Sequence, residues 1–231
     1  MKEIEPIAHF RSPFTSKFGI PRQSGLINDL QGSIVFETKY RREEALHGLE
    51  EFDYLWLIWG FSANSSKNKK GSLNLTVRPP RLGGNKRIGV FASRSPFRPN
   101  GLGLSSVKIV EVKTCEIVVR GADLMDGTPI YDIKPYLPYV DSHPEAKGGF
   151  TDRKGWKTLE VVFPEELKAH ITVNELEILK KALAQDPRPK YQHDAERIYG
   201  MPFGGKDVKF RIDGKKCIVT DITALERNSS D

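Results

Sequence analysis

Cysteine is scarce in this sequence of 231 residues: only Cys115 and Cys217 are present, far apart along the chain. Two isolated thiols supply neither a disulfide framework nor a thiolate metal site, so we expect a reducing, cytoplasmic setting. The five histidines are scattered without the spacing of a zinc site, and we expect no bound metal. No apolar run approaches the roughly 20 residues that cross a bilayer. The opening segment MKEIEPIAHF is acidic and mixed, unlike a signal peptide, so we expect no membrane attachment.

Acidic residues are missing from one long stretch. The chain carries 36 basic and 30 acidic side chains, for a net charge of +6, but none of the acidic ones lies between Asp53 and Glu111. The same stretch contains ten lysines and arginines. Positive charge concentrated in this way suits a polyanion such as nucleic acid. A solvated basic surface, paired with acids from elsewhere in the fold, is the alternative.

The signatures of common nucleotide-binding and hydrolytic sites are also missing. The segment GLGLSS (101–106) has two glycines, but Ser106 stands where the third glycine of a dinucleotide fingerprint would lie. It also precedes a strand-like run, whereas the fingerprint opens a helix. The chain contains neither a phosphate-loop motif nor a Gly-x-Ser-x-Gly motif. These absences argue against a doubly wound sheet and against the familiar nucleophilic hydrolases.

What the sequence does contain is a series of short β-branched and aromatic runs. They occupy residues 4–10, 33–38, 53–61, 87–93, 104–112, 115–122 and 158–163. Clusters of Gly, Pro, Asn or Asp bound several of them, as expected of strands joined by turns. The run from Tyr54 to Phe61 is apolar at both alternating sets of positions, which predicts burial on both faces. Short strands without long intervening helices predict a mainly β domain, a barrel or a sandwich, over residues 1–164.

Helical patterns are few. A short helix is expected over residues 42–50, and a better one begins at Thr172, where the sequence fits a capping box followed by a leucine stripe. The segment DPRP (186–189) ends that helix, because proline has no amide hydrogen. A β-hairpin should follow, turning at Asp213-Gly214. We therefore expect a small α+β domain over residues 165–231.

Four compact blocks combine rigid backbone with polar side chains. They are PRQSG (21–25), FASRS (91–95), DLMDGTPIYDIKPY (123–136) and QDPRPKY (185–191). Each has an ordinary interpretation as a decorated turn, a solvated arginine or a set of aspartates that cap turns. Each also places directional donors or acceptors on loops held by a sheet, where binding sites usually lie. The residues alone indicate a basic β-protein with a polar pocket.

Taken in order, these blocks resemble the TsaA-like family. The resemblance rests on RSPF, PRQSG, LWLIWGFS, VRPPRLGG, GVFASRSPFRPNGLG, DGTPIYDIKPYLPY and AQDPRPKY, and it covers about residues 4–225. Members of this family are S-adenosylmethionine-dependent tRNA methyltransferases that act on N6 of threonylcarbamoyladenosine beside the anticodon. The resemblance implies a single-sheet β-barrel with a small α+β C-terminal domain. It also implies S-adenosylmethionine as cofactor, tRNA as partner and a homodimer.

The resemblance further implies the residues of the cofactor pocket. Carried over block by block, they are Pro21, Arg22, Gln23, Arg94, Leu104, Asp123, Leu124, Met125 and Asp126. An aspartate is expected to pair with the ammonium of the cofactor and an arginine with its carboxylate, with the choice among them left open. The chain departs from several members after the LWLI strand, where Ser62 and Ala63 replace a histidine and a polar partner. Any cofactor contacts at that point must therefore differ.

For the RNA, the expected contacts come from the basic stretch and from the QDPRPKY block. They are Arg78, Arg81, Lys86, Arg87, Arg98, Arg188 and Tyr191. Most of these side chains would meet phosphates, which position the RNA without reading its sequence. Phe97 and Tyr191 are candidates for stacking on splayed bases.

The reaction also needs a group that removes or orients the proton on N6. A carboxylate such as Asp186 or Asp126 is the expected acceptor, and we name Asp186; a backbone carbonyl that merely orients the proton is the alternative. Two other functions stay open from the sequence: an RNA-binding protein without enzymatic activity, and a methyltransferase of the same fold with another substrate.

Overall fold

A computed structural model shows how the chain folds, and it describes residues 3–62, 75–79, 82, 86–152, 158–188, 192 and 194–225. Three of the predicted site residues, Ala63, Arg81 and Tyr191, lie outside the described residues. Contacts along the chain divide it into two compact units. Unit 1 comprises Met1–Ser12 and Arg22–Gly155, and unit 2 comprises Pro13–Pro21 and Trp156–Asp231. Within the described part of the chain, no helix is long and apolar enough to cross a membrane.

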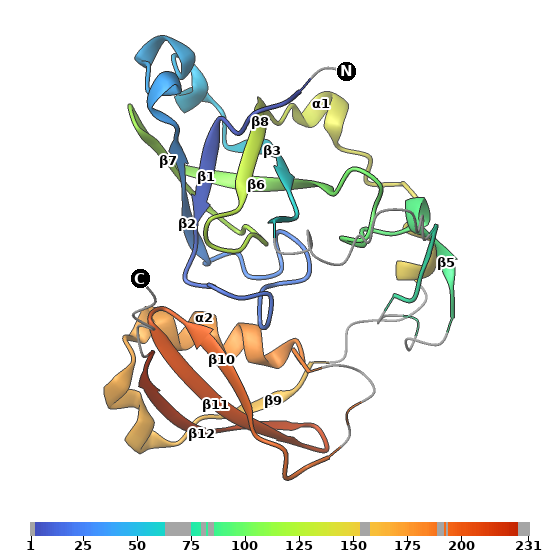
Figure 1. Ribbon diagram of the computed structural model, residues 1–231, viewed down its shortest axis with the longest axis vertical. Coiled ribbons are helices and arrows are strands. Elements are labelled where there is room, and N and C mark those ends of the chain that lie inside the picture. The colour runs from blue at the N-terminus through green and yellow to red at the C-terminus, as the bar shows by residue number, and fades with distance from the viewer. Residues whose placement is uncertain are drawn as a thin grey trace. The chain divides into compact units, whose positions relative to one another are not determined.

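Unit 1 is built around a closed barrel of antiparallel strands (Figure 1). Its strands are β1 (Ala8–Arg11), β2 (Gln31–Phe36), β3 (Tyr54–Gly60), β6 (Leu102–Lys113), β7 (Glu116–Arg120) and β8 (Pro129–Pro135). They are paired in the order β1-β2-β7-β6-β3-β8 and then back to β1. Beside the barrel, β4 (Thr76–Val77) pairs with β5 (Ile88–Gly89), and a short helix α1 (Pro138–Asp141) follows β8. The predicted single-sheet barrel is confirmed.

The barrel interior is filled by alternate residues of its strands. On β3, Leu55, Leu57 and Trp59 are buried, while the residues between them are only partly so. The predicted burial of this strand on both faces is therefore wrong: one face points into the barrel and the other is partly covered, in part by the ring of Tyr136 against Trp56. The interior is completed by residues from the other strands and the loops, among them Phe10, Ile34, Val107, Ile117, Val119, Leu124 and Ile130.

Two local predictions for this unit are corrected. Residues 42–50 do not form one helix but two 3₁₀ turns, Glu43–Ala45 and Leu49–Glu51. Gly48 between them has a φ of 85°, a left-handed conformation that interrupts a right-handed helix. The run 87–93 pairs only over β5 and then turns at Val90–Ala92.

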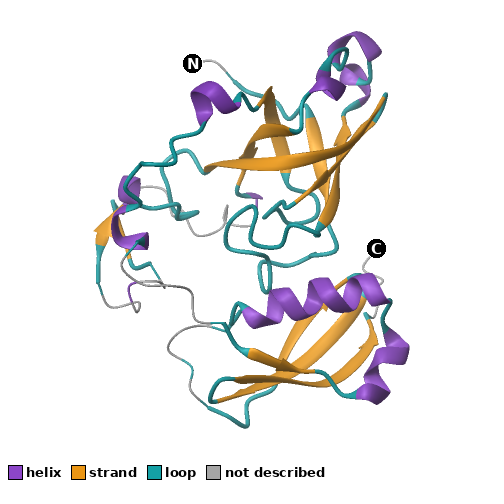
Figure 2. Ribbon diagram, turned by 180° about the vertical axis from the view of Figure 1, so that it is seen from behind, coloured by secondary structure: helices purple, strands orange, loops and turns teal. Residues whose placement is uncertain are grey.

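Unit 2 is a four-stranded sheet covered by one helix (Figure 2). Its elements are β9 (Glu160–Val162), the 3₁₀ segment Glu165–His170, α2 (Val173–Ala184), β10 (Tyr199–Phe203), β11 (Lys206–Asp213) and β12 (Lys216–Ala224). The sheet order is β10-β11-β12-β9, with β9 parallel to β12. The predicted helix and the hairpin between β11 and β12 are confirmed.

Two segments counted with the N-terminal domain in the sequence division fold with unit 2. Strand β9 pairs with β12, so residues just before position 165 complete the second sheet. The segment 13–21 is held by aromatic contacts: Phe14 is fully buried with its ring centroid 5.1 Å from that of Phe203. Phe18 in the same segment stacks on the rings of Tyr199 and Phe210. Packing of these two phenylalanines explains why a short piece near the N-terminus belongs to a unit that is otherwise C-terminal.

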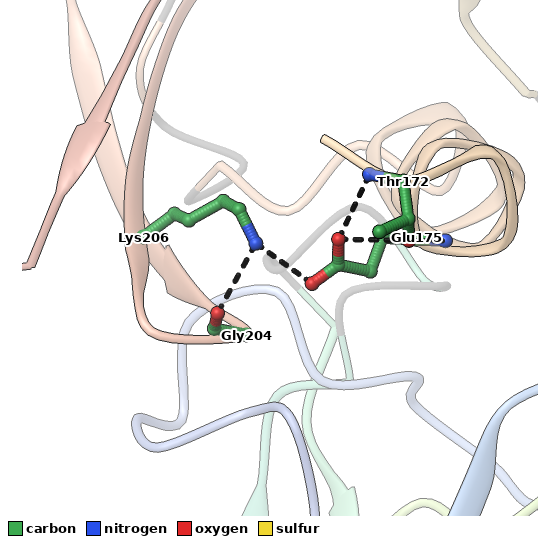
Figure 3. A network of polar contacts seen from close by, with 4 residues as sticks. All are labelled: Thr172, Glu175, Gly204 and Lys206. Atoms are coloured by element: carbon green, nitrogen blue, oxygen red, sulfur yellow. Dashed lines mark hydrogen bonds and ion pairs between the residues drawn. The ribbon is translucent and has the colours of Figure 1, made fainter. Parts of the chain in front are cut away.

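A polar network fixes the start of α2 (Figure 3). Thr172 caps the helix by accepting a hydrogen bond from the amide of Glu175, and the Glu175 carboxylate accepts one from the amide of Thr172 at 3.0 Å. The other oxygen of Glu175 accepts a hydrogen bond from Lys206 Nζ at 2.8 Å, and Lys206 also reaches the carbonyl of Gly204. The helix end is thereby joined to the hairpin of β10 and β11.

Candidate cofactor site and basic surface

Three of the polar blocks recognised in the sequence meet in unit 1. Arg94 NH1 donates a hydrogen bond to Gln23 Oε1 at 2.7 Å, and Gln23 Nε2 donates to the carbonyl of Arg22. The positive charge of Arg94 also acts on the carboxyl of Asp123. We call Arg22, Gln23, Arg94 and Asp123 the polar cluster. The structure thus brings together side chains that are up to about a hundred positions apart in sequence.

The turn that carries Arg94 is fixed by hydrogen bonds. The amide of Val90, a buried residue, donates to the carbonyl of Leu75 at 2.9 Å. The hydroxyl of Ser93 donates back to the carbonyl of Val90 at 2.8 Å. Arg98 NH1 in turn donates to the carbonyl of Ser93 at 3.1 Å. Arg94 therefore projects from a braced turn and keeps its position at little entropic cost.

The loop with Arg22 and Gln23 is joined to the segment that carries Asp123. The amide of Gly25 donates to the carbonyl of Gly121 at 2.8 Å, and the amide of Gly121 donates to the carbonyl of Leu30 at 2.9 Å. These bonds connect the loop to the end of β7, directly before Asp123. Backbone hydrogen bonds therefore hold the loop that carries Arg22 and Gln23 against the segment that leads to Asp123.

Asp123 is the electrostatically distinctive member of the polar cluster. Burial raises the pKa of its carboxyl above the ordinary aspartate value. The hydroxyl of Ser105, the amides of Asp123 itself and Ser24, and the charge of Arg94 act in the opposite direction. The Ser105 hydroxyl donates to Oδ1 at 2.5 Å. The site therefore contains a partly buried carboxyl surrounded by donors, which can accept hydrogen bonds from a cationic or hydroxylated ligand.

The other predicted cofactor residues differ in what they can offer. Leu104 on β6 is 57% exposed, so its side chain is available to a ligand, and Met125 is partly buried. Leu124 is 1% exposed and belongs to the barrel core, so it can meet a ligand only through its backbone. Pro21 is buried and belongs to unit 2. Ser62 is exposed at the end of the β3 region.

Asp126 has partners of its own, away from those of Asp123. Its Oδ1 accepts a hydrogen bond from the amide of Ser12 at 3.1 Å, and its Oδ2 lies 3.5 Å from Arg11 NH1. These contacts tie the loop before β8 to the end of β1. Two aspartates were expected from the sequence to bind the ammonium of the cofactor. Of these, Asp123 belongs to the polar cluster, whereas Asp126 contacts the end of β1.

The basic stretch forms an exposed surface segment in its described residues. Arg78, Lys86 and Arg87 are exposed. Two aromatic side chains accompany them: Phe91 is 73% exposed and Phe97 is 48% exposed. Phe97 was named from the sequence as a stacking residue, whereas Phe91 was not. Phe91 lies in the 3₁₀ turn Val90–Ala92, next to the buried Val90, so no strand alternation marks it as exposed.

Asp186 lies in unit 2, directly after α2. Its residue is 8% exposed and adopts a φ of 53°, uncommon for any residue except glycine. Arg188 Nε donates to its carboxylate at 3.0 Å, and both side chains are largely buried. Burial, together with the nearby charge of Asp186, raises the pKa of the Cys217 thiol to about 12, so that this cysteine is not a nucleophile at neutral pH.

These features define a class of protein: a closed antiparallel β-barrel whose loops gather arginine, glutamine and aspartate into a polar cluster, followed by a small α+β unit. Comparison with known families assigns the particular one. The model of the tRNA-methyltransferase O N-terminal domain matches residues 9–142, and the model of the TrmO C-terminal domain matches residues 157–225. The chain belongs to the tRNA-methyltransferase O family.

Individual relatives agree with this assignment. The tRNA (adenine(37)-N6)-methyltransferase of Escherichia coli is 38% identical over 222 residues, which cover 91% of this chain and 93% of the relative. The human protein of the same name is 37% identical over 140 residues, 60% of this chain and 31% of its own length. The crystal structure of TrmO from Pseudomonas aeruginosa superimposes with a TM-score of 0.76 at 30% identity, covering 97% of this chain and 100% of that one.

Proposed function

We propose that this protein is an S-adenosylmethionine-dependent tRNA methyltransferase that modifies N6 of the adenosine at position 37, beside the anticodon. The preferred substrate is the threonylcarbamoylated form of that adenosine, as the family resemblance implies. The observation that carries the proposal is the polar cluster, on a chain that is 38% identical over 91% of its length to a relative of this name. A homodimer in the cytoplasm, where tRNA is found, is the proposed working form.

The polar cluster has the chemistry that the cofactor requires. The amino-acid end of S-adenosylmethionine carries an ammonium and a carboxylate, and its ribose carries two hydroxyls. Asp123 can accept hydrogen bonds from the ammonium or the hydroxyls, whereas Arg94 or Arg22 can pair with the carboxylate. Asp126 is less suited to this role because Arg11 already pairs with it.

When bound, S-adenosylmethionine supplies a methyl group on a positively charged sulfur. In the transfer, the lone pair of N6 forms the new N–C bond, the electron pair of the S–C bond stays on sulfur, and the N6 proton is lost. The donor is already activated, so the main task of the protein is to align the two reactants. N6 of the modified base is bonded to a carbonyl carbon, so its lone pair becomes available only as its proton leaves.

Asp186 remains our candidate for the acceptor of this proton. Its carboxylate is held in one orientation by Arg188, at a backbone conformation that only a few residue types tolerate. The ion pair has an equally good structural explanation as a lock on the segment after α2. If a folded Asp186→Asn variant keeps its activity, Asp186 has the structural role and not the catalytic one.

The exposed cations and aromatic rings of residues 75–98 form the proposed RNA surface. Arg78, Lys86 and Arg87 are exposed and would meet phosphates, whereas part of the Arg98 guanidinium braces the turn before it. Phe91 and Phe97 offer faces on which unstacked anticodon-loop bases can lie. Arg81, Tyr191 and Arg188 were also named from the sequence for this role. Arg188 is largely buried and paired with Asp186, so it is less suited to a phosphate than the exposed cations.

Methyl transfer to synthetic anticodon stem-loops tests the proposal directly. With S-adenosylmethionine labelled in its methyl group, we expect transfer to a stem-loop carrying threonylcarbamoyladenosine and little to one carrying plain adenosine. RNA binding without any cofactor binding would favour the non-enzymatic alternative. Cofactor binding without transfer to either RNA would favour a methyltransferase with another substrate. Light scattering on the purified protein tests the dimer.

A further inference from the structure

A buried chain of hydrogen bonds leads through the barrel wall to Asp123. Trp59 Nε1 on β3 donates to Ser105 Oγ on β6 at 3.0 Å, and Ser105 Oγ donates to Asp123 Oδ1 at 2.5 Å. Trp59 is 7% exposed and Ser105 is 1% exposed. The chain therefore begins among the apolar residues of the core and ends on a carboxylate of the polar cluster.

The direction of the chain follows from chemistry. An indole N–H can only donate, so the oxygen of Ser105 must act as acceptor toward Trp59. A serine hydroxyl has one proton, and the Trp59 bond leaves that proton directed at Asp123. A lone serine hydroxyl rotates among several partners, whereas this one is held in the orientation that serves the carboxylate.

A glycine makes room for the indole. Gly103 lies opposite Trp59 in the pairing of β3 with β6. A Cβ placed on Gly103 would lie 2.3 Å from Cε2 and 2.5 Å from Cζ2 of Trp59, far inside van der Waals contact. The second glycine of the GLGL segment is thus needed for the position of the ring, which explains it without a phosphate-binding role.

A simpler explanation is that Trp59 and Ser105 only satisfy each other's buried polar atoms. It does not account for where the chain ends. A serine that needed a partner alone could bond to a backbone carbonyl of its strand, but its proton goes instead to a carboxyl acted on by Arg94 and by the amide of Ser24. Among the described residues, Arg94 is the group whose charge acts on the Asp123 carboxyl.

We propose that Gly103, Trp59 and Ser105 are positioning residues that hold the Asp123 carboxylate in the orientation in which it binds S-adenosylmethionine. The inference rests on the proposed function, because it assigns a ligand to the polar cluster. The bond from Ser105 opposes the effect of burial on Asp123, so its loss should raise the pKa of Asp123 further. Binding is proposed to need the ionised carboxylate. As the pH is lowered, a variant without the Ser105 bond would therefore lose cofactor affinity at a higher pH than the unaltered protein does.

Calorimetry with S-adenosylmethionine across a pH series tests this. For Ser105→Ala we expect an affinity about tenfold lower at neutral pH, the usual cost of removing one hydrogen bond to a charged group, and an acid limb of binding displaced to higher pH. Ser106→Ala is the matched control, since it removes the same hydroxyl from the opposite side of the same strand. It should bind as the unaltered protein does.

Trp59→Phe keeps an aromatic side chain but removes the N–H together with the five-membered part of the indole ring. It tests the proposal where Ser105→Ala is found unfolded by circular dichroism, provided that the same measurement shows Trp59→Phe to be folded. Its affinity should fall by less than that of Ser105→Ala, with the acid limb displaced in the same direction. If folded Ser105→Ala binds S-adenosylmethionine with unchanged affinity and unchanged pH dependence, the positioning role of Ser105 and Trp59 is overturned. The proposed function would remain intact. Failure of the unaltered protein to bind the cofactor would overturn both.

Discussion

The two units each contain a network of polar side chains, and the networks differ in where they end. The chain from Trp59 through Ser105 runs inside the barrel of unit 1 and ends on Asp123. The network of Thr172, Glu175 and Lys206 in unit 2 closes on the backbone of its own helix and hairpin (Figure 3). The first leaves a carboxyl set among donors, whereas the second uses its carboxyl to complete the fold.

Burial distinguishes them as well. Ser105 is almost fully buried, whereas the side chains of Glu175 and Lys206 keep 24% and 23% of their exposure. Desolvation is costly for a charge without a partner, so a protein keeps a buried carboxyl only where something holds it. Under the proposed function, the comparison suggests a rule: an aspartate or glutamate in a polar network indicates function only when the network does not already use up its acceptors. The predictions below test this distinction, beginning with the largest effect.

Arg94→Ala should have the largest effect on cofactor binding. Arg94 contributes the hydrogen bond to Gln23 and the positive charge near Asp123, and we propose that it also meets the cofactor's carboxylate. Loss of two charged hydrogen bonds should lower the affinity for S-adenosylmethionine about 100-fold in calorimetry. Arg87→Ala, which removes an exposed arginine from the same segment, is the control and should leave the affinity within about twofold. Equal losses in both variants would mean that only the overall charge matters.

Asp186→Asn should lower stability and, because we propose Asp186 as the acceptor of the N6 proton, it should also lower methyl transfer. Asparagine tolerates the positive φ of this position, so the substitution removes the charge but not the backbone conformation. Breaking the largely buried pair with Arg188 should cost about 2 kcal/mol, less than a fully buried pair because both side chains keep some exposure. Urea unfolding measures this cost, and methyl transfer below the unfolding midpoint measures activity. A folded variant with unchanged activity would remove the catalytic role and leave the structural one.

The sequence predicted the parts of this fold that depend on local chemistry. The capping box at Thr172, the stop at DPRP and the hairpin at Asp213-Gly214 each arise from a few neighbouring residues, and all three are confirmed. Strand β8 was not predicted, because prolines at both ends and polar residues between them give it little β-propensity. It forms because β1 and β3 pair with its two edges, which is a tertiary effect.

The site was predicted in part for the same reason. The blocks with Gln23, Arg94 and Asp123 were visible as polar residues on punctuated backbone, and the family resemblance joined them. No local pattern could show that Ser105 and Trp59 complete the site, since both lie within ordinary strand sequences. Their role depends on the register of β3 against β6, which places Trp59 opposite Gly103.

Phe91→Ala should weaken RNA binding without affecting the cofactor. Stacking of a base on an aromatic ring contributes about 1–3 kcal/mol, so we expect the KM for the stem-loop to rise about tenfold. Phe91→Tyr keeps a stacking face and should restore it. Tyr139→Ala, which removes an even more exposed ring elsewhere on unit 1, is the control and should leave the KM unchanged. A changed oligomeric state in Phe91→Ala would show that the ring serves an interface between subunits.

Glu175→Gln should have the smallest effect and none on activity. Burial acts to raise the pKa of Glu175, but hydrogen bonds from Lys206 and Thr172 outweigh it, and the pKa is lowered. The charged form is therefore favoured by folding, and its contribution is present at neutral pH and lost as the pH falls through the lowered pKa. Glutamine keeps the capping box, so the variant should lose only the ion pair, about 0.5 kcal/mol at neutral pH, and this loss should shrink as the pH falls through the lowered pKa of Glu175. Thr172→Ala, which removes the cap, should lose about 1 kcal/mol at both pH values. Urea unfolding at pH 7 and pH 3 distinguishes the two, and a loss of cofactor affinity in either variant would contradict the view that this network serves only the fold.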